Sequence, residues 1–562
     1  MKKLVTLMLC ITLFTLMVNS KTVYVNATTG SDLNTGLTWA TALQSIPYAL
    51  TVASASGDNL WITGGTYTIP GTSTFNQGNT NMYGGFLGNE AYLSTRPKSD
   101  LDGNGIVEPW EFTNATVLTF NVTDMSAITY TGAAFDGFTL SATATMNNNQ
   151  TASVYSMSVW TTSFANNTIK NNNLTFSVNT DKGGYYPFFR AYGTVNNCLF
   201  EKNTVTVNAS QFAYINPFIC VNSSYNITIG TKFLNSVIRN NTVTVDYSTA
   251  ASGINPYAVR GIIMNVTGGM NPTSLTANTG GLPTTVANCV ITNNDMIYIP
   301  GAANVSMSDA SIISLGSALS YNGTKQPTTD SILNCTVANN KGFKTGQGGL
   351  YILSDATSYH YIFNNVFYNN QRAWNGGTYS IINMVQNNTL NAGLISNNIT
   401  DGGGLSNTTG QIVNQDNTLG TGSNLPYFKT PTTTIGITTD NSTELSNWTL
   451  TTGSYLIGKG IVTTRLKDKN GVAFAATRAI GAYEFTGTAT KLQSIAENKT
   501  NFYSSNGRLV SKVDSKIEVI NFAGVILWNG KVTIGQEIAL PKGAYIVHST
   551  TEKGTSVQKI VL

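Results

Sequence analysis

The sequence has few charged side chains and almost no histidine. Asp, Glu, Lys and Arg make up 10% of its 562 residues, against about 25% in typical soluble domains, and there are two histidines. The formal net charge of +4 is small for this length, so the concentrated positive charge that nucleic-acid binding requires is missing. The 10% aromatic content argues against a disordered chain. We therefore expect a folded protein that does not bind nucleic acid.

Long apolar runs are also scarce, with a single exception at the start of the chain. Leu4–Val18 is nearly all apolar, follows Lys2-Lys3 and is closed by Asn19-Ser20. This is the pattern of a signal peptide over residues 1–20, and the run is too short for a membrane-spanning helix. We predict an exported protein, secreted or held at the outer surface of the cell, without a transmembrane segment.

One seven-residue pattern recurs through the middle of the chain. Its second residue is always small and its fourth is always large and apolar. Because residues two apart on a strand share a face, we expect these two positions to point inward. The third and fifth positions, the latter including Lys170, Glu201 and Arg239, should point outward. Asn at both ends suits tight bends, since Asn tolerates left-handed backbone angles. The copies span residues 166–172, 197–203, 235–241, 288–294, 334–340 and 364–370, with a weaker one at 396–399.

A second alternating run follows the closing Asn, as in Thr204–Val207 and Thr242–Val245. Bend, strand, bend and strand at variable intervals are typical of a coil that returns on itself. Each coil buries its inner face only by stacking on its neighbours. The fold class predicted is all-β, a parallel β-helix. A sandwich or a propeller is the alternative, but the fixed blade signatures of propellers are missing.

The cysteines fit the same repeat. They form no CxxC pair, which argues against zinc binding and thioredoxin-like redox chemistry. Cys198, Cys289 and Cys335 all occupy the small second position, so we expect a column of buried thiols that pack as small apolar groups. A disulfide between coils is the alternative, and the state of Cys220 is left open.

The N-terminal region resembles the opening of bacterial (Bacteroidota-type) right-handed parallel β-helix proteins. The resemblance rests on Thr22–Tyr67, with a short helix over Ile46–Ala53, and on Tyr83–Phe86. Ala479–Phe485 resembles the closing strand of that family. The resemblance implies a right-handed solenoid over residues 21–485 with an N-terminal capping helix, and it informs the fold rather than an activity.

The C-terminal region resembles another bacterial module. After a linker at 486–496, residues 497–562 regain lysine and glutamate and resemble the C-terminal sorting domain of type IX secretion, a small β-sandwich. This resemblance implies the type IX secretion machinery as a partner, with the protein tethered to the cell surface or released. The usual Tyr-Pro-Asn-Pro-like opening is replaced by Asn501–Asn506. A generic small β-domain is the alternative.

Residues 100–111 match the calcium-loop template D-x-[DN]-x-[DN]-G-x5-E. Alternate side chains of such a loop converge on one point, and Gly105 allows the sharp turn. Pro97 argues against a long entering helix, and the chain has no second such loop. We predict a single structural Ca²⁺ site inserted in the β-helix domain, which extracellular calcium would keep filled; the alternative is an acidic turn without an ion. The predicted ligands are Asp100, Asp102, Asn104, Glu108 and Glu111, with the carbonyl of Ile106.

No catalytic centre is evident in the repeat. A glycosidase needs two carboxylates at a defined separation, but no two acids share equivalent outward positions of the pattern. His360 lies between two tyrosines, and we expect it to be an exposed strand residue. The loosest enzymatic candidate is Asp181-Lys182 with Arg190, beside the Gly- and Tyr-rich stretch 183–186, which could equally contact sugar.

We therefore expect a secreted or surface-displayed β-helix that binds carbohydrate or adheres, with an extracellular glycan or surface ligand as its partner. The alternative is a polysaccharide lyase or glycoside hydrolase built on the same scaffold.

Overall fold

The computed structural model divides the chain into two compact units, Met1–Thr486 and Gly487–Leu562. The predicted signal peptide, apart from Ser20, and nearly all of the predicted linker lie outside the described residues. The structure describes residues 20–69, 80–120, 129–130, 134–148, 157–159, 163–178, 188–209, 218–222, 230–250, 263–267, 283–299, 311–315, 320–321, 324–325, 328–342, 350–352, 358–372, 383–384, 394–400, 406–407, 413–415, 418–419, 425–487, 501–521, 526–551 and 554–562.

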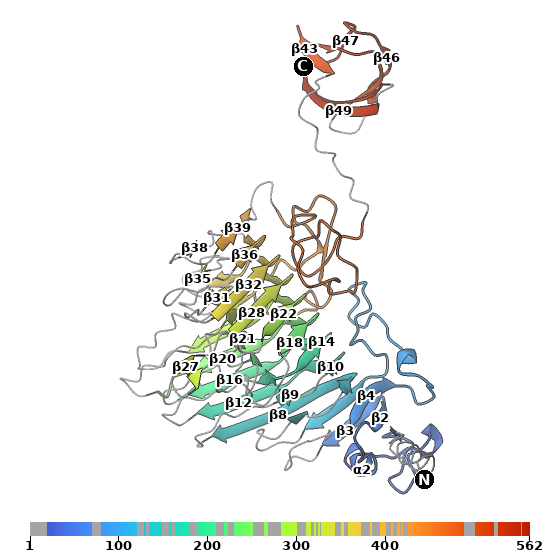
Figure 1. Cartoon of the computed structure of the whole chain (residues 1–562), viewed down its shortest axis with the longest axis vertical. Helices are drawn as coiled ribbons and strands as arrows, with labels where there is room; N and C mark the ends of the chain where they lie inside the picture. The colour runs from blue at the N-terminus through green and yellow to red at the C-terminus, as the bar shows by residue number, and fades with distance from the viewer. Residues whose placement is uncertain are drawn as a thin grey trace, which may run out of the picture. The chain divides into compact units, whose positions relative to one another are not determined.

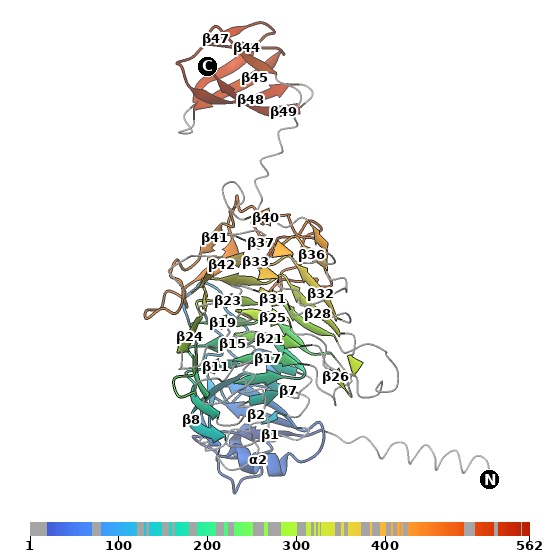
Figure 2. The same ribbon diagram turned by 90° about the vertical axis from the view of Figure 1, so that its left-hand side faces the viewer.

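The first unit is the predicted parallel β-helix (Figures 1 and 2). Its first sheet has twelve strands, each hydrogen-bonded in parallel to the strand of the next coil. Those strands are β1 Thr22–Val25, β2 Asn59–Thr63, β4 Asn81–Phe86, β7 Ala134–Asp136, β10 Ser163–Ala165, β14 Thr194–Asn196, β18 Lys232–Leu234, β22 Thr284–Ala287, β28 Thr328–Leu333, β32 Ser358–Phe363, β36 Leu394–Ser396 and β39 Val413–Gln415.

The second sheet is formed by the repeat itself. The long strand β8 links it to the third sheet, because β8 pairs with β11 in its first part and with β12 in its second. The second sheet contains β3 Gly65–Ile69, β5 Thr116–Phe120, β8 Phe138–Asn148, β11 Thr168–Lys170, β15 Leu199–Glu201, β19 Val237–Arg239, β23 Val290–Thr292, β29 Thr336–Ala338, β33 Val366–Tyr368, β37 Ile399–Thr400 and β40 Thr418–Leu419.

The third sheet continues each coil after the closing Asn, where the alternating Thr-Val runs were predicted, and the fourth sheet completes the turn. The third sheet contains β12 Asn173–Val178, β16 Thr204–Ala209, β20 Thr242–Asp246, β24 Asp295–Ile299, β30 Lys341–Gly342 and β34 Gln371–Arg372. The fourth contains β6 Thr129–Tyr130, β9 Met157–Val159, β13 Phe189–Ala191, β17 Ile219–Asn222, β21 Met264–Thr267, β25 Ile313–Leu315 and β31 Leu350–Ile352. Two further pairs, β26 Ser320–Tyr321 with β27 Thr324–Lys325 and β35 Asn383–Met384 with β38 Ser406–Asn407, stand apart from these sheets.

The asparagines of the repeat have two separate roles. Those at the first and sixth positions take left-handed backbone angles, as predicted; φ is 54° at Asn166 and 57° at Asn171. Those at the seventh position are buried inside the coils and form a ladder, in which the amide nitrogen of Asn203 donates to Asn241 Oδ1 at 2.9 Å and that of Asn241 donates to Asn294 Oδ1 at 2.8 Å. The bends are therefore fixed both by backbone conformation and by side-chain bonds between neighbouring coils.

The inner faces of the coils carry the residues that the repeat predicted. Second-position Cys198, Cys289 and Cys335 and fourth-position Phe200 and Ile238 are fully buried. Cys198, Cys220, Cys289 and Cys335 are buried, and none of them forms a disulfide. This confirms that the second-position cysteines pack as small buried thiols.

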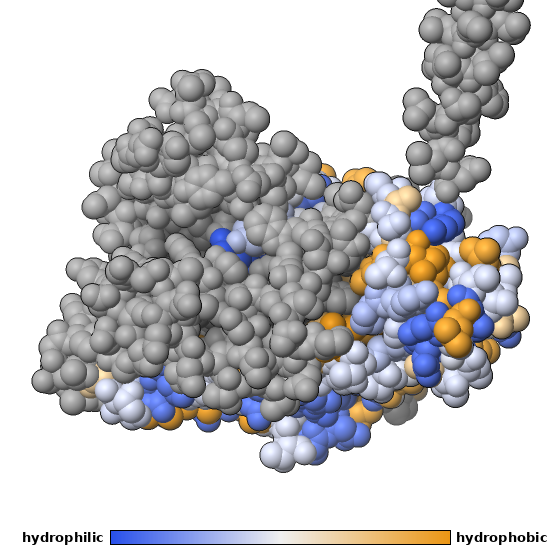
Figure 3. Space-filling model, turned by 90° about the horizontal axis from the view of Figure 1, so that it is seen from below, coloured by the Kyte–Doolittle hydropathy of each residue, from blue (hydrophilic) through white to orange (hydrophobic). Residues whose placement is uncertain are grey.

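A short helix covers the first coil, as predicted. It is α2 Ile46–Val52, the only α-helix in the part of the chain that the structure describes. Ser45 caps it by accepting a hydrogen bond from the Tyr48 N–H, and Ile46 and Ala49 join the apolar core. Two short 3-10 helices, Trp39–Thr41 and Leu93–Thr95, also lie near this end of the chain. Figure 3 views the molecule from this end and shows hydrophilic and hydrophobic side chains interspersed among the described residues. The helix thus covers the end of the stack, where bare strand edges would invite aggregation.

The last part of the first unit does not continue the coils. Residues 425–486, here called the strap, contain only β41 Phe428–Thr430 and β42 Asn447–Leu450 and run along the outer side of the second sheet. The third-position residues Leu199, Val237 and Val290 pack against the strap and are at most 6% exposed. The prediction that the third position faces outward is correct relative to the coil interior, but the strap buries these side chains in a second apolar core.

The predicted closing strand over Ala479–Phe485 is wrong. This part of the strap has no strand. Instead, the Gly481 N–H donates to the Asn364 carbonyl oxygen at 2.8 Å and the Ala482 N–H donates to Thr336 Oγ1 at 3.2 Å. Its apolar side chains pack sideways on the coils, which explains why the segment is buried without joining a sheet.

The second unit is the predicted small β-sandwich. One antiparallel sheet contains β43 Phe502–Ser505, β44 Arg508–Ser511 and β47 Glu537–Ala539, and the other contains β45 Ser515–Asn521, β46 Ile526–Val532, β48 Ala544–Thr551 and β49 Gly554–Val561. Phe502 and Leu509 from the first sheet pack against Ile517, Val519 and Val547 from the second. None of the helices in the described residues is long and apolar enough to cross a membrane.

Candidate metal centre and adjoining pocket

The 100–111 loop leaves the coils after the 3-10 helix Leu93–Thr95 and returns at β5. An antiparallel bridge between Lys98 and Phe112 closes its base. Gly103 and Gly105 have φ of 78° and 83°, the left-handed region in which glycine is favoured. The sharp turn that the motif requires at Gly105 is therefore present.

Three of the predicted ligands converge. The carboxylates of Asp100, Asp102 and Glu111 each offer an oxygen, and these oxygens all lie within 4.8 Å of one another. The two oxygens of Asp100 accept hydrogen bonds from the N–H groups of Gly103 and Gly105, at 2.8 and 2.9 Å. The turn thus holds Asp100 facing the loop, although its side chain is exposed.

Glu111 organises the loop from its other end. Its Oε1 accepts from the Leu101 and Asp102 N–H groups at 2.9 and 3.2 Å, and its Oε2 accepts from the Glu108 N–H at 2.8 Å. These bonds fix the carboxylate in the centre of the loop, where the motif needs a two-oxygen ligand.

Asn104 and Glu108 lie beside this cluster. The Asn104 amide nitrogen donates to Asp102 Oδ2 at 3.2 Å and to Glu108 Oε1 at 3.1 Å. The NH2 group of Asn104 therefore lies between these two carboxylates. The other oxygen of Glu108 is buried and has no hydrogen-bond partner among the described residues. Burial raises the pKa of Glu108 to about 7, against the opposing effect of the Lys469 charge. The Ile106 N–H donates to Asn104 Oδ1 at 2.8 Å.

The donor set suits a hard cation. Carboxylate oxygens are the ligands that Ca²⁺ takes in proteins, and Asp100, Asp102 and Glu111 offer three of them within 4.8 Å of one another. Asp102 departs from the usual pattern, because its Oδ2 is also paired with Arg239 Nη2 at 2.8 Å.

Arg239 ties the loop to the coils and to the strap. From β19 its guanidinium also binds Glu201 Oε1 on β15 at 2.8 Å and donates to the Glu444 carbonyl oxygen at 3.4 Å. Burial alone would lower the pKa of Arg239, but the carboxylates of Glu201 and Asp102 outweigh burial and hold that pKa above its usual value. Arg239 therefore remains charged and joins three parts of the chain at one point.

A buried lysine makes a second connection between loop and strap. Lys469 Nζ lies 4.7 Å from the centre of the Trp110 ring and 5.6 Å from that of Tyr483. Burial lowers the pKa of Lys469, while the charge of Glu108 opposes that change. Asn447 of the strap also donates to the Asn104 carbonyl oxygen at 3.4 Å. The loop is thus held between the coils and the strap.

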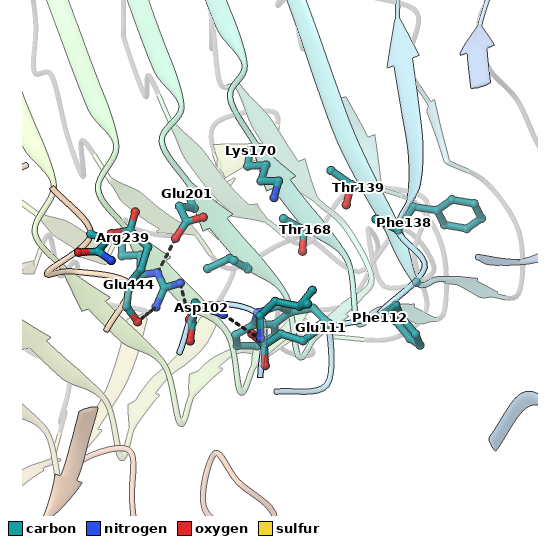
Figure 4. A pocket seen from close by; sticks show the side chains of 16 residues that line it. Asp102, Glu111, Phe112, Phe138, Thr139, Thr168, Lys170, Glu201, Arg239 and Glu444 are labelled. Atoms are coloured by element: carbon teal, nitrogen blue, oxygen red, sulfur yellow. Dashed lines mark hydrogen bonds and ion pairs between the residues drawn. The ribbon is translucent and has the colours of Figure 1, made fainter. Parts of the chain in front are cut away.

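A pocket of about 320 Å³ opens beside the loop. Figure 4 shows its polar side chains: the Arg239 network lies at one side, and Lys170, Thr168 and Thr139 line the other. Its apolar lining is Leu101, Trp110, Phe112, Phe138 and Leu199, and its carboxylates are Asp102, Glu111, Glu201 and Glu444. Fifth-position residues that the repeat predicted to face outward do line a cavity, but Glu201 and Arg239 are only 7% and 5% exposed because the loop and the strap cover them.

Two predictions about other residues have different outcomes. His360 is not exposed; its side chain is 1% exposed and its Nδ1 lies 3.7 Å from Asp330 Oδ2 in the neighbouring coil. His360 and Ile362 are two residues apart on β32, so both side chains point into the coil, which explains why His360 is buried. Asp181, Lys182 and the Tyr-rich stretch 183–186 lie outside the described residues, so the structure places only Arg190 of that group.

The repeat pattern did not predict that acidic side chains would converge, but the structure brings four carboxylates together in one pocket. The carboxylates of the pocket come from the loop, one coil and the strap. Glu444 and Lys469 belong to the strap, and no local pattern around them indicated a site. A useful signal was present only at Arg239 and Glu201, which share the fifth position of adjacent copies and therefore had to stack.

Neither a protein-family model nor a curated protein sequence matches the chain.

Proposed function

We propose that the protein is a secreted or surface-displayed β-helix that binds an extracellular glycan in the pocket beside the 100–111 loop, and that this loop holds a structural Ca²⁺. The observation that carries the proposal is the pocket itself. Its volume of about 320 Å³ falls at the lower end of the range for small-molecule sites, about 300–1,000 Å³. A site of this size suits one or two sugar rings.

The lining supports a polar, ring-shaped ligand. Thr139 and Thr168 offer hydroxyls, and Asn441 offers an amide, while Trp110 and Phe112 form part of an apolar wall. A mostly apolar wall with a few fixed polar groups is the usual composition of a specific binding site. Sugars present both kinds of surface, an apolar ring face and a rim of hydroxyls.

The calcium part of the proposal is supported by the converging carboxylates and by the unpartnered oxygen of buried Glu108. Asp102 and Glu111 belong to both the loop and the pocket lining. An ion in the loop would therefore fix the wall of the binding site as well as the loop.

Export is proposed from the two ends of the chain. The N-terminal segment has the pattern of a signal peptide, and the second unit is a β-sandwich like the sorting domain that it resembles. Deletion of residues 487–562 should leave the first unit folded but retained in the cell. If the shortened protein still reached the outside of the cell in the wild-type amount, the proposed role of the second unit in export would be contradicted.

Glycan-array binding of the mature chain tests the main proposal. Thr139→Trp should fill the pocket and abolish binding, because Thr139 lines it and is partly exposed. Thr206→Trp, on the third sheet, is the matched control and should bind as the wild type does. Binding that survives Thr139→Trp would place the glycan elsewhere, and the absence of any bound glycan would refute the proposal.

Catalysis by a polysaccharide lyase or glycoside hydrolase is the second candidate, favoured by the convergence of four carboxylates in one pocket. Binding is preferred because Asp102 and Glu201 are both paired with Arg239, and Glu444 with Lys202 at 2.6 Å. A general acid or base must exchange its proton freely. Release of reducing or unsaturated ends from a polysaccharide panel would establish the enzymatic alternative.

A further inference from the structure

We infer that the glycan bound in the pocket is an acidic one, and that Lys170 binds its carboxylate. This inference rests on the proposed glycan-binding function and specifies the class of ligand. Lys170 is the last residue of β11, and its side chain points into the pocket between Glu201 and Thr139 (Figure 4). Among the described residues, its ammonium group makes no ion pair.

The other charges of the pocket wall already have partners. Arg239 binds Asp102 and Glu201, each at 2.8 Å. Glu444 is paired with Lys202 at 2.6 Å. Each of these three carboxylates therefore has a cationic partner within the protein, and the two cations leave one net negative charge among them.

Glu111 is the remaining carboxylate. Both of its oxygens accept backbone hydrogen bonds from within the loop, and a Ca²⁺ ion in the loop would add two positive charges beside it. Lys170 is then the one charged group in the described pocket lining that is left for a ligand.

The position of Lys170 at the edge of the covered face explains why it is available. In the following coils the fifth-position side chains are covered, since Glu201 is 7%, Arg239 5% and Thr292 1% exposed. Lys170 remains partly exposed, so the pocket opens at this residue.

A carboxylated sugar matches this arrangement. Lysine binds a carboxylate as a point charge, and a pair that is partly shielded from water is stronger than one on an open surface. Thr139 and Thr168 line the same pocket as Lys170, and their hydroxyls can bind the ring hydroxyls of the same sugar residue. A uronic-acid residue carries both groups on one ring.

The test compares acidic oligosaccharides with their own methyl esters. Trisaccharides of galacturonate, glucuronate, mannuronate and guluronate are titrated calorimetrically into the mature chain with Ca²⁺ present. For at least one of them the acid should bind at least about tenfold more tightly than the ester, the effect of one charge-assisted hydrogen bond. Lys170→Gln should reduce the affinity for that acid to the level of its ester.

Lys232→Gln is the matched control, because Lys232 is an exposed lysine on β18 of the first sheet and is not part of the pocket lining. It should bind the acid as the wild type does. Equal binding of acid and ester, or an acid preference that survives in Lys170→Gln, would overturn this inference while leaving glycan binding intact. If the chain binds no acidic, esterified or neutral glycan, the proposed function fails together with the inference.

Discussion

The seventh-position asparagine holds neighbouring coils together from inside. Asn241 shows the side-chain bonds that join the coils: its Oδ1 accepts from the backbone and side-chain nitrogens of Asn203, at 3.0 and 2.9 Å, and its amide nitrogen donates to the Phe200 carbonyl at 3.0 Å and to Asn294 Oδ1 at 2.8 Å. Each bond crosses from one coil to the next. Buried polar groups that lose their partners are costly, so the ladder constrains both the bend and the stacking register.

Asn241→Ala should destabilise the first unit by about 2–5 kcal/mol, because it leaves several buried donors and acceptors without partners. The urea midpoint of unfolding, followed by circular dichroism, measures the change. Thr244→Ala on the partly exposed side of the adjoining β20 is the control and should change stability by less than about 0.5 kcal/mol. If both variants unfold at the wild-type midpoint, the ladder does not stabilise the coils.

The four thiols of the mature chain should resist alkylation until it unfolds. They are buried and form no disulfide, and burial raises the pKa of Cys198 to about 12, which disfavours the reactive thiolate. Mass spectrometry after maleimide treatment should show no adduct on the native protein and four after guanidinium denaturation without a reductant. Two adducts after denaturation would instead indicate a disulfide between coils.

At the scale of elements, the strap is the part that the coils need to complete their outer side. Trp448 is buried in the second apolar core. Its ring packs edge-to-face against that of Phe428, with the ring centres 5.0 Å apart. First- and sixth-position asparagines hold the backbone of the strap: Asn293 donates to the Thr434 carbonyl at 2.7 Å and Asn364 to the Ile461 carbonyl at 2.8 Å. The left-handed bends of the repeat thus present amide groups outward, and the strap is bound by them.

Trp448→Ala should loosen the strap while the coils stay intact. Loss of a buried tryptophan costs about 3–5 kcal/mol, and that cost falls on the contact between strap and second sheet. Hydrogen exchange should become faster in peptides from 425–486 and remain unchanged in β16 and β20. Tyr427→Ala, an exposed aromatic of the same segment, is the control; an equal effect of both variants would contradict a packing role for Trp448.

At the scale of the whole molecule, the sequence was most informative where contacts are local or repeated. The small and large residues at the second and fourth positions indicated the coils, the thiol column and the inward face correctly. Third-position Leu199, Val237 and Val290 look like ordinary strand residues, and nothing near them shows that a segment from 425 onward covers them. The link between Arg239 and Glu444 spans 205 positions, so only the folded chain brings these residues together.

The same reasoning separates what was predicted of the site from what was not. The spacing within 100–111 is local, and it correctly grouped Asp100, Asp102 and Glu111. The pocket is lined by the loop, the strap and strands of four successive coils, and no single stretch of sequence contains it. The calcium part of the proposal therefore rests on the loop, which the sequence indicated, and the glycan part rests on the pocket, which only the structure shows.

A calorimetric titration of the mature chain with Ca²⁺ tests the central claim most directly. We predict one site per chain, with a dissociation constant of about 10⁻⁴–10⁻³ M or tighter, as in extracellular calcium modules. Asp100→Ala, which removes an exposed ligand, should abolish the binding heat, whereas Asp440→Ala, an exposed acid of the strap, should leave it unchanged. No saturable binding at millimolar Ca²⁺, or binding that persists in Asp100→Ala, would contradict the account.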